Sequence, residues 1–201
     1  MSCAIHDHCL SAAEPLSDAL HAAMAAAGPI EFSVRRDLAF PVYLARAVTG
    51  QQLSVAAART IWARVEESAQ GAPLMESFRP ERSEALRACG LSGAKTRTVC
   101  AIAEAARDGL LEVHALAPLS PEARAERLTS IWGVGQWTAD MMNMFYFGET
   151  DIWPDGDVAA RKTLERLTSP RRKTVRTAAR FAPYRSYLAL YMWRHVDAPP
   201  T

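Results

Sequence analysis

The chain has 201 residues, of which 49% are apolar and 22% are charged, and its formal net charge is +1. This composition is typical of a globular protein with one domain, or two small lobes, around a sizeable core. It excludes a broadly basic coat for nucleic acid but permits a local phosphate site. No apolar run approaches the roughly 18–20 residues that span a bilayer, and no secretory signal opens the sequence, so we expect an intracellular, cytoplasmic protein.

Cysteine and histidine gather near the N-terminus, where Cys3, His6, His8 and Cys9 lie close together. Thiolate and imidazole are zinc ligands, so a metal site is one interpretation. No second ligand cluster follows, and we therefore favour a mobile tail over residues 1–10. The four cysteines of the chain show no spacing typical of a disulfide framework or of an iron–sulfur cluster.

Apolar residues recur at helical spacing along most of the chain, without strand-like alternation or an internal repeat. We therefore expect an all-α fold of about eight to ten short helices. Ser54, Ser92 and Ser120 precede three of them as N-caps, and Pro121 suits a first helical turn. The expected helices cover residues 12–27, 40–48, 55–69, 80–88, 93–107, 121 to the following glycine turn, 136–147, 158–167, 170–180 and 183–196.

A glycine turn, Gly133-Val134-Gly135, separates two of these helices. Glycine readily adopts positive φ and leaves backbone amides uncovered. Uncovered amides before a helix attract phosphate, because they are unpaired and the helix dipole is positive there. The turn alone is weak evidence, and its surroundings decide its meaning.

An acidic loop at residues 151–157 follows the second helix. Asp157 stands at an N-cap position, which gives it two interpretations. It caps a helix, or its carboxylate stabilises a cation that develops on a substrate. Asp155 is the rival, and because Gly156 separates the two, only one is expected to face a cleft.

Tryptophans and basic residues surround this loop in the sequence. Aromatic faces stack on bases and attract positively charged ones, although we expect Trp132 and Trp153 to be core residues. The basic residues of 171–180 are expected to be solvated surface rather than a DNA contact. The pair Gln51-Gln52 is either a solvated corner or a functional element.

The segment LTSIWGVGQWTAD, followed by PDGDVAARK, resembles the helix-hairpin-helix-plus-Gly/Pro/Asp superfamily of base-excision DNA glycosylases. The segments AVTGQQLSVAAA, LSGAKTRTV and YRSYLALYMW are similar to its alkylation-repair branch, 3-methyladenine DNA glycosylase II, in the compact form. The resemblance extends over residues 40–193. It implies an all-α, two-lobed fold with the active site in the cleft between lobes. Lobe one would cover about residues 40–148 with the hairpin, and lobe two residues 11–39 plus 149–201.

The resemblance also implies roles for individual residues. Asp157 matches the catalytic aspartate, and Gln52 the residue inserted into the gap left by a flipped nucleotide. The expected base pocket consists of Trp137, Met141, Tyr191 and Trp193. The expected DNA-binding residues are Gln51, Gln52, Leu53, Ser54, Lys95, Gly133, Val134 and Gly135. The backbone carbonyls of Thr129, Ile131 and Val134 are expected to hold a structural Na⁺ or K⁺, with no other cofactor.

Two positions depart from the pattern of the longer relatives, since Met141 replaces a pocket tyrosine and Gln52 replaces an aliphatic wedge. Trp137 stands where bifunctional relatives carry a Schiff-base lysine, and tryptophan has no amine nucleophile. We therefore expect a monomeric, monofunctional enzyme that hydrolyses the N-glycosidic bond of alkylated purines in double-stranded DNA, such as 3-methyladenine and 7-methylguanine. The alternatives are a glycosylase for mismatched, deaminated or oxidised bases, a catalytically inactive DNA-binding module, and an interaction domain unrelated to DNA.

Overall fold

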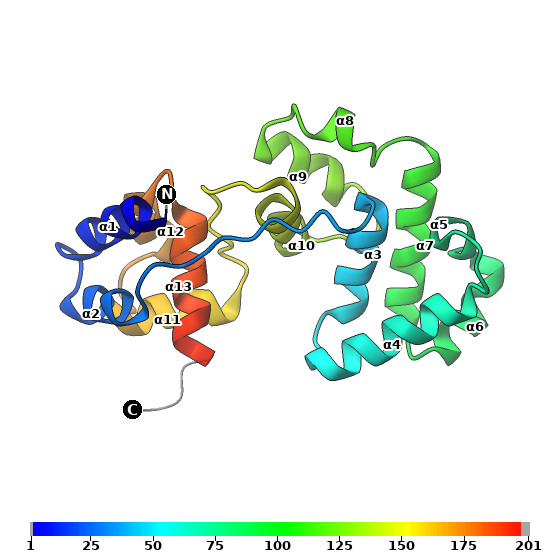
Figure 1. Ribbon diagram of the computed structural model, residues 1–201, viewed down its shortest axis with the longest axis horizontal. Helices are drawn as coiled ribbons and strands as arrows, with labels where there is room; N and C mark the ends of the chain where they lie inside the picture. Colours follow the sequence, from blue (N-terminus) through cyan, green and yellow to red (C-terminus); the bar gives the residue numbers. More distant parts are fainter. Residues whose placement is uncertain (1, 198–201) are drawn as a thin grey trace. The chain divides into compact units, whose positions relative to one another are not determined.

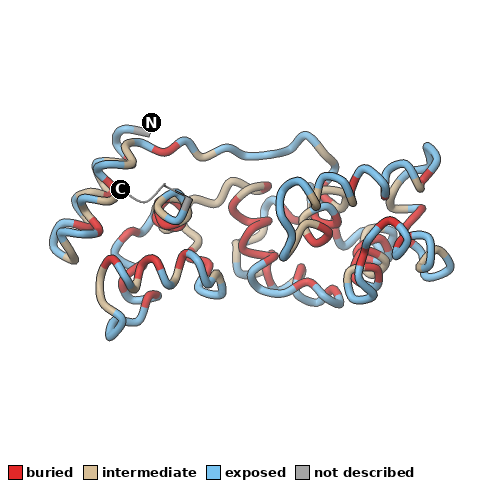
Figure 2. The backbone as a smooth tube through the Cα atoms, turned by 90° about the horizontal axis from the view of Figure 1, so that it is seen from below, coloured by how far each residue is buried: buried red, intermediate tan, exposed pale blue. Residues whose placement is uncertain are grey.

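The computed structural model describes residues 2–197, which contain helices and turns but no strand (Figure 1), so the expected all-α class is confirmed. The chain forms two compact units. Unit 1 comprises Met1–Val34 and Asn143–Thr201, and unit 2 comprises Arg35–Met142. No helix of the described residues is both long and apolar enough to cross a membrane. Buried and exposed residues alternate along the helices, as expected for amphipathic helices around a core (Figure 2).

Unit 2 is built around α7, which packs against α3, α5 and α6, while α9 packs against α10. Its helices are α3 (Phe40–Gly50), α4 (Val55–Ser68), α5 (Leu74–Ser77), a 3-10 turn (Pro80–Arg82), α6 (Ser83–Ala88), α7 (Gly93–Arg107), α8 (Val113–Leu116), α9 (Pro121–Thr129) and α10 (Gln136–Met142). Leu44 of α3, Ile102 of α7 and Leu128 of α9 are fully buried. Their burial removes the apolar stripe of each helix from water.

Three of the helices in unit 2 begin at the serines that the sequence predicts. The hydroxyl oxygen of Ser54 accepts from the Ala57 amide at 3.2 Å, and that of Ser120 accepts from the Ala123 amide at 3.2 Å. Ser92 Oγ accepts from the Lys95 amide at 3.3 Å. Each bond satisfies one of the amides that a helix start leaves without a partner.

Unit 1 is built around α13, which packs against α11 and α2. Its helices are α1 (Ser2–Ala13), α2 (Asp18–Ala27), a π-helical turn (Asn143–Phe147), α11 (Val158–Leu167), α12 (Thr174–Ala178), a 3-10 turn (Ala179–Phe181) and α13 (Arg185–Asp197). Leu20 of α2, Leu164 of α11 and Leu188 of α13 are fully buried. The core of this unit therefore joins the two ends of the chain.

Ser2–Ala13 form helix α1, so the expectation of a mobile tail over residues 1–10 is wrong for residues 2–10, and Met1 lies outside the described residues. Ile5, Cys9 and Ala13 are spaced four residues apart and are all buried, which gives α1 an apolar stripe to pack on α2. Burial also raises the pKa of the Cys9 thiol to about 12 and keeps it protonated. Among the described residues, no three His, Cys, Asp or Glu side chains are grouped as metal ligands.

Several expected helices have other boundaries, and three of them differ most clearly. The helix expected at 12–27 is two helices, because Pro15 lies between them and Ser17 caps α2 by accepting from the Leu20 amide at 3.4 Å. The helix expected at 136–147 is α-helical only to Met142. The helix expected at 170–180 begins at Thr174, since residues 170–173 form a turn.

Candidate functional site

The glycine hairpin connects α9 to α10 within unit 2. The Val134 amide donates to the Ile131 carbonyl at 3.0 Å, which closes the turn. Gly133 has φ +82, and a Cβ there would overlap Thr98 Oγ1 and lie 3.0 Å from Thr98 Cβ. Gly133 therefore lets the hairpin approach α7 closely, and no L residue fits without a shift. A Cβ on Gly135 would meet nothing within 4 Å, so the protein interior gives no reason for that glycine.

Trp132 of the hairpin is 43% exposed, and the expectation that it is a core residue is wrong. The guanidinium carbon of Arg97 lies 3.9 Å from the centroid of its ring. This cation–π contact covers one face of the indole and lets it stay at the surface. Trp153 is 9% exposed and is buried as expected.

The loop between α3 and α4 holds Gln52 in an uncommon conformation. Gln52 has φ +58, in the left-handed region that non-glycine residues seldom adopt, and its side chain is exposed. Gln51, which precedes it, is held by one hydrogen bond from its side chain and one to its backbone carbonyl. The side-chain amide of Gln51 donates to Thr138 Oγ1 at 2.9 Å, and its backbone carbonyl accepts from Lys95 Nζ at 2.6 Å. The exposed side chain at the tip thus stands on an ordered loop.

Lys95, which the resemblance places among the DNA contacts, makes two hydrogen bonds within unit 2. Its ammonium donates to the carbonyl oxygens of Thr49 at 2.8 Å and Gln51 at 2.6 Å. These bonds join α7 to the end of α3, and partial burial lowers the pKa of Lys95. In this structure the ammonium holds the loop that carries Gln52.

Asp157 caps a helix, as one interpretation of its position predicts, and it is also the hydrogen-bond partner of a tryptophan. Its Oδ1 accepts from the Ala160 amide at 2.8 Å, which begins α11. The same oxygen accepts from Trp193 Nε1 of α13 at 3.0 Å. Two N–H donors from two helices therefore fix the direction of this half-buried carboxylate.

Asp155 is engaged differently. Its Oδ1 accepts from Trp153 Nε1 at 3.1 Å and from the Thr174 hydroxyl at 2.6 Å. These bonds fasten the acidic loop to the start of α12. Asp155 is thus bonded within the loop and to α12, whereas Asp157 is bonded to α11 and α13.

Four aromatic residues of unit 1, beginning with Trp193, contact one another in succession. The ring centroids of Trp193 and Phe145 are 6.1 Å apart, those of Phe145 and Phe32 are 6.0 Å apart, and those of Phe32 and Tyr187 are 5.6 Å apart. Phe32 and Phe145 are half-buried, and sequence reasoning gave neither a role. Phe145 could have been found from its place in the helix after the hairpin. Phe32 precedes every segment that carries the resemblance, so no signal marks it.

The four residues expected in the base pocket have unequal exposure. Trp137 of unit 2 is 37% exposed and Trp193 of unit 1 is half-buried, while Met141 of unit 2 is 8% exposed. Tyr191 is 2% exposed, and its hydroxyl is bonded to His6 Nδ1 at 2.6 Å and to the Gly28 carbonyl at 3.1 Å. Burial raises its pKa. Tyr191 is therefore an interior residue that holds the N-terminal helices, and its predicted place in a base pocket is not supported.

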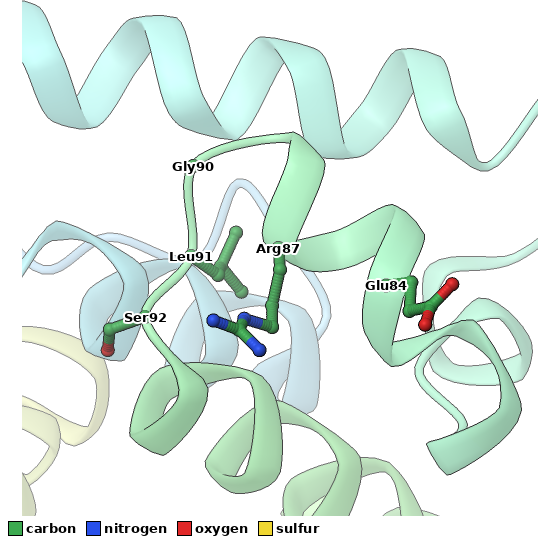
Figure 3. Close-up of a pocket in the computed structure, with 5 residues that line it drawn as sticks. All are labelled: Glu84, Arg87, Gly90, Leu91 and Ser92. Atoms are coloured by element: carbon green, nitrogen blue, oxygen red, sulfur yellow. The ribbon is translucent and has the colours of Figure 1, made fainter.

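A separate hollow of about 520 Å³ lies between α6 and the start of α7 (Figure 3). The side chain of Glu84 points away from Arg87, and Ser92 points to the opposite side of the hollow. Ser92 Oγ already caps α7. Because these polar groups do not converge, the hollow has no set of ligating groups.

Comparisons with known proteins find relatives by sequence and by fold. No family model matches the chain. Its sequence is 35% identical to DNA-3-methyladenine glycosylase 1 of Schizosaccharomyces pombe over 159 residues, covering 75% of this chain and 70% of the relative. Its fold is similar to that of a DNA-3-methyladenine glycosidase from Bacillus halodurans, with a TM-score of 0.76, 27% identity, and coverage of 93% and 88% of the two chains.

A second solved structure is similar as well, the Schizosaccharomyces pombe 3-methyladenine DNA glycosylase in complex with abasic DNA. The TM-score is 0.72 at 27% identity, and the match covers 92% of this chain and 95% of that chain. The glycosylase fold class expected from the sequence is confirmed by these similarities.

Proposed function

Because the chain belongs to the family of DNA-3-methyladenine glycosylases, we propose that it excises alkylated purines from double-stranded DNA. The substrates are bases such as 3-methyladenine and 7-methylguanine. The reaction hydrolyses the N-glycosidic bond and leaves an abasic site in an intact strand. The observation that carries the proposal is the Asp157 carboxylate, fixed by the Ala160 amide and the Trp193 indole.

The chemistry requires a fixed negative charge more than a proton donor. A purine alkylated at N3 or N7 is already cationic, so the electrons of the breaking C1′–N bond neutralise the departing base. Positive charge then grows on the sugar, and the Asp157 carboxylate stabilises it. Water adds to C1′ and loses a proton, for which the same carboxylate is a suitable acceptor. The two hydrogen bonds to Oδ1 hold the group ready without reorganisation during the reaction.

The target base must leave the stack before this chemistry, because C1′ is inaccessible within a duplex. Gln52, raised on the ordered loop with φ +58, is the proposed wedge, with Leu53 beside it. The amides of Gly133 and Gly135 are the proposed clamp on the DNA backbone, because the Val134 amide already donates to the Ile131 carbonyl. Flipping costs a few kcal/mol and costs least at a damaged or mispaired base, which contributes to selectivity.

Stacking is the proposed mode of base recognition. Trp193 and Phe145 form an aromatic pair beside Asp157, and stacking contributes about 1–3 kcal/mol per base with little dependence on base identity. A site of this kind favours several alkylated purines over one. Trp137 and Met141 remain predicted base contacts that rest on the resemblance. With tryptophan at position 137 in place of an amine nucleophile, the enzyme is proposed to lack lyase activity.

The hairpin is also proposed to hold Na⁺ or K⁺ through backbone carbonyls. Thr129 closes α9, and the carbonyls of a last helical turn have no helical partner. The Ile131 carbonyl accepts one hydrogen bond, from Val134, and keeps a second lone pair. These oxygens suit a hard cation, which would stiffen the hairpin and add positive charge beside a phosphate.

A base-release assay tests the proposal. Duplexes that contain methylated purines, uracil or oxidised purines are incubated with the wild type, Asp157→Asn and Asp155→Asn. We expect the wild type and Asp155→Asn to release methylated purines. Asp157→Asn should release none while it binds DNA with an affinity within a few-fold of wild type.

The outcomes separate the alternatives. Release only from uracil-containing or oxidised duplexes would favour a glycosylase of another specificity. DNA binding without release from any duplex would indicate a binding module. Full activity of Asp157→Asn would assign catalysis to another group.

A further inference from the structure

A pocket of about 580 Å³ lies on unit 2, between α3 and the start of α4. Arg46 of α3, Arg59 of α4 and Arg35 of the preceding segment line it. Gln52 and Trp137 also belong to its wall. All the lining residues lie within Arg35–Met142, so the pocket is a property of unit 2 alone.

The charges in the pocket favour an anion. Three guanidinium groups line it against one carboxylate, Asp37, which leaves two positive charges in excess. The charges of Arg35, Asp37 and Arg46 all act on the hydroxyl of Tyr43, which places these groups near one another. Burial, as the largest cause, raises the pKa of Tyr43 and keeps its hydroxyl protonated as a hydrogen-bond donor.

A cationic base is a poor occupant of this pocket, since three guanidinium groups would repel an alkylated purine. A phosphodiester fits better, because the planar guanidinium matches two phosphate oxygens and stays charged at every physiological pH. Because Gln52 lines the pocket, its position indicates which phosphodiester of the DNA would bind there. If Gln52 enters the gap left by a flipped nucleotide, the backbone at that gap lies beside the pocket.

We propose that this pocket binds a phosphodiester of the DNA backbone next to the gap that Gln52 fills, with Arg46 and Arg59 as the ligating side chains. The inference rests on the proposed function, because it places Gln52 in DNA. Arg46 on α3 and Arg59 on α4 would form a second phosphate-binding site, besides the amides of the glycine hairpin. Together the two sites would hold the distorted strand at separate points.

The salt dependence of DNA binding tests the assignment. Removing one phosphate-binding charge reduces the steepness of log K against log salt by about 0.9 for duplex DNA. We therefore expect Arg46→Gln and Arg59→Gln each to reduce the slope by about that amount, on duplexes with and without an abasic site. Arg64→Gln is the matched control, because Arg64 is an exposed arginine of the same helix as Arg59 but outside the pocket, and its slope should equal that of wild type.

A lysine variant separates the effect of the positive charge from that of the guanidinium geometry. Arg59→Lys keeps the positive charge but not the guanidinium fork, so it should restore the slope while binding less tightly than wild type. Thermal unfolding of each variant shows whether the fold is retained. Arg46 and Arg59 are exposed, so their substitution should not change the melting temperature.

The results distinguish the two proposals. Unchanged slopes in both glutamine variants, with methylated purines released by the wild type, would overturn the pocket assignment alone. Reduced slopes without base release by the wild type would overturn the proposed activity alone. A wild type that does not bind duplex DNA would overturn both.

Discussion

Lys95 Nζ donates a hydrogen bond to the Gln51 carbonyl oxygen at 2.6 Å, so α7 holds the residue immediately before Gln52. A second bond from the same ammonium reaches the Thr49 carbonyl at 2.8 Å. Gln52 follows with a positive φ, which costs free energy in a residue with a side chain. We expect the Lys95 contacts to offset that cost and to hold the proposed wedge in this conformation.

Lys95→Met should therefore impair base flipping more than DNA binding. The two carbonyls lose their donor, and Gln52 is free to relax to an ordinary conformation. We expect base release at saturating enzyme to slow by about tenfold or more, equivalent to roughly 1.4 kcal/mol. Fluorescence of 2-aminopurine beside the lesion reports flipping directly and should show the same loss.

The control for that variant is Lys162→Met, which removes an exposed lysine of α11. It should flip and release bases as wild type does. If Lys95→Met flips the base at the wild-type rate but binds DNA weakly, Lys95 contacts DNA and is not a positioning residue.

Two tryptophans of unit 1 make the same kind of bond to different aspartates, which gives a matched pair. Trp193→Phe keeps an aromatic ring but removes the Nε1 donor 3.0 Å from Asp157 Oδ1. Trp153→Phe removes the donor 3.1 Å from Asp155 Oδ1. We expect Trp193→Phe to slow single-turnover base release by about 10–100-fold, because the Asp157 carboxylate loses one of the hydrogen bonds that orient it.

Trp153→Phe should leave the single-turnover rate within about threefold of wild type, because its partner anchors the loop. Equal effects of the two substitutions would mean that the whole acidic loop, and not the Asp157 carboxylate, limits the rate. A larger effect from Trp153→Phe would return Asp155 to consideration as the catalyst.

The sequence predicted most of the features that depend on neighbouring residues. Ser54 and Asp157 are caps as expected, because an N-cap bond spans only three residues. The glycine turn was likewise visible, although only Gly133 of its two glycines has a positive φ. Helix class followed from the apolar spacing.

The features that the sequence did not reveal depend on contacts between distant residues. The Lys95–Gln51 bond spans 44 residues, so nothing local distinguishes it from a DNA contact. Phe32 meets Phe145 across more than half of the chain. Tyr191 looked available for a base until helix α1, which the sequence did not predict, placed His6 on its hydroxyl.

Substitution of the two hairpin glycines should have different effects, on stability at Gly133 and on DNA binding at Gly135. Gly133→Ala forces a Cβ onto Thr98 at φ +82, so we expect the unfolding free energy to fall by about 1–3 kcal/mol. Gly135→Ala meets nothing within 4 Å and should keep wild-type stability. If the Gly135 amide faces a phosphate, however, the added methyl group should weaken DNA binding.

Denaturant unfolding and DNA titration of both variants check this pair. Adding Thr98→Ala to Gly133→Ala should recover part of the lost stability, since the overlapping hydroxyl is removed while the strain in φ remains. Wild-type DNA affinity in Gly135→Ala would contradict a backbone clamp at that residue.

The buried carboxyl of Asp140 should make the stability of the protein depend on pH. This residue of α10 is 8% exposed, and burial raises its pKa to about 6, although the Gln136 side-chain amide donates to its Oδ1 at 2.8 Å. A carboxyl whose pKa is raised by folding favours the folded state while it is protonated. That contribution is complete below the unfolded pKa of about 4 and is lost as the pH rises through about 6.

Asp140→Asn should therefore stabilise the protein above pH 6, where the wild type buries a charge, and change little near pH 4. A difference of about two pKa units corresponds to roughly 2–3 kcal/mol at most. Melting temperatures of the two proteins, measured across this range, should diverge as the pH rises. A gap that stays constant from pH 4 to pH 8 would show that Asp140 titrates in the folded protein as it does in the unfolded chain.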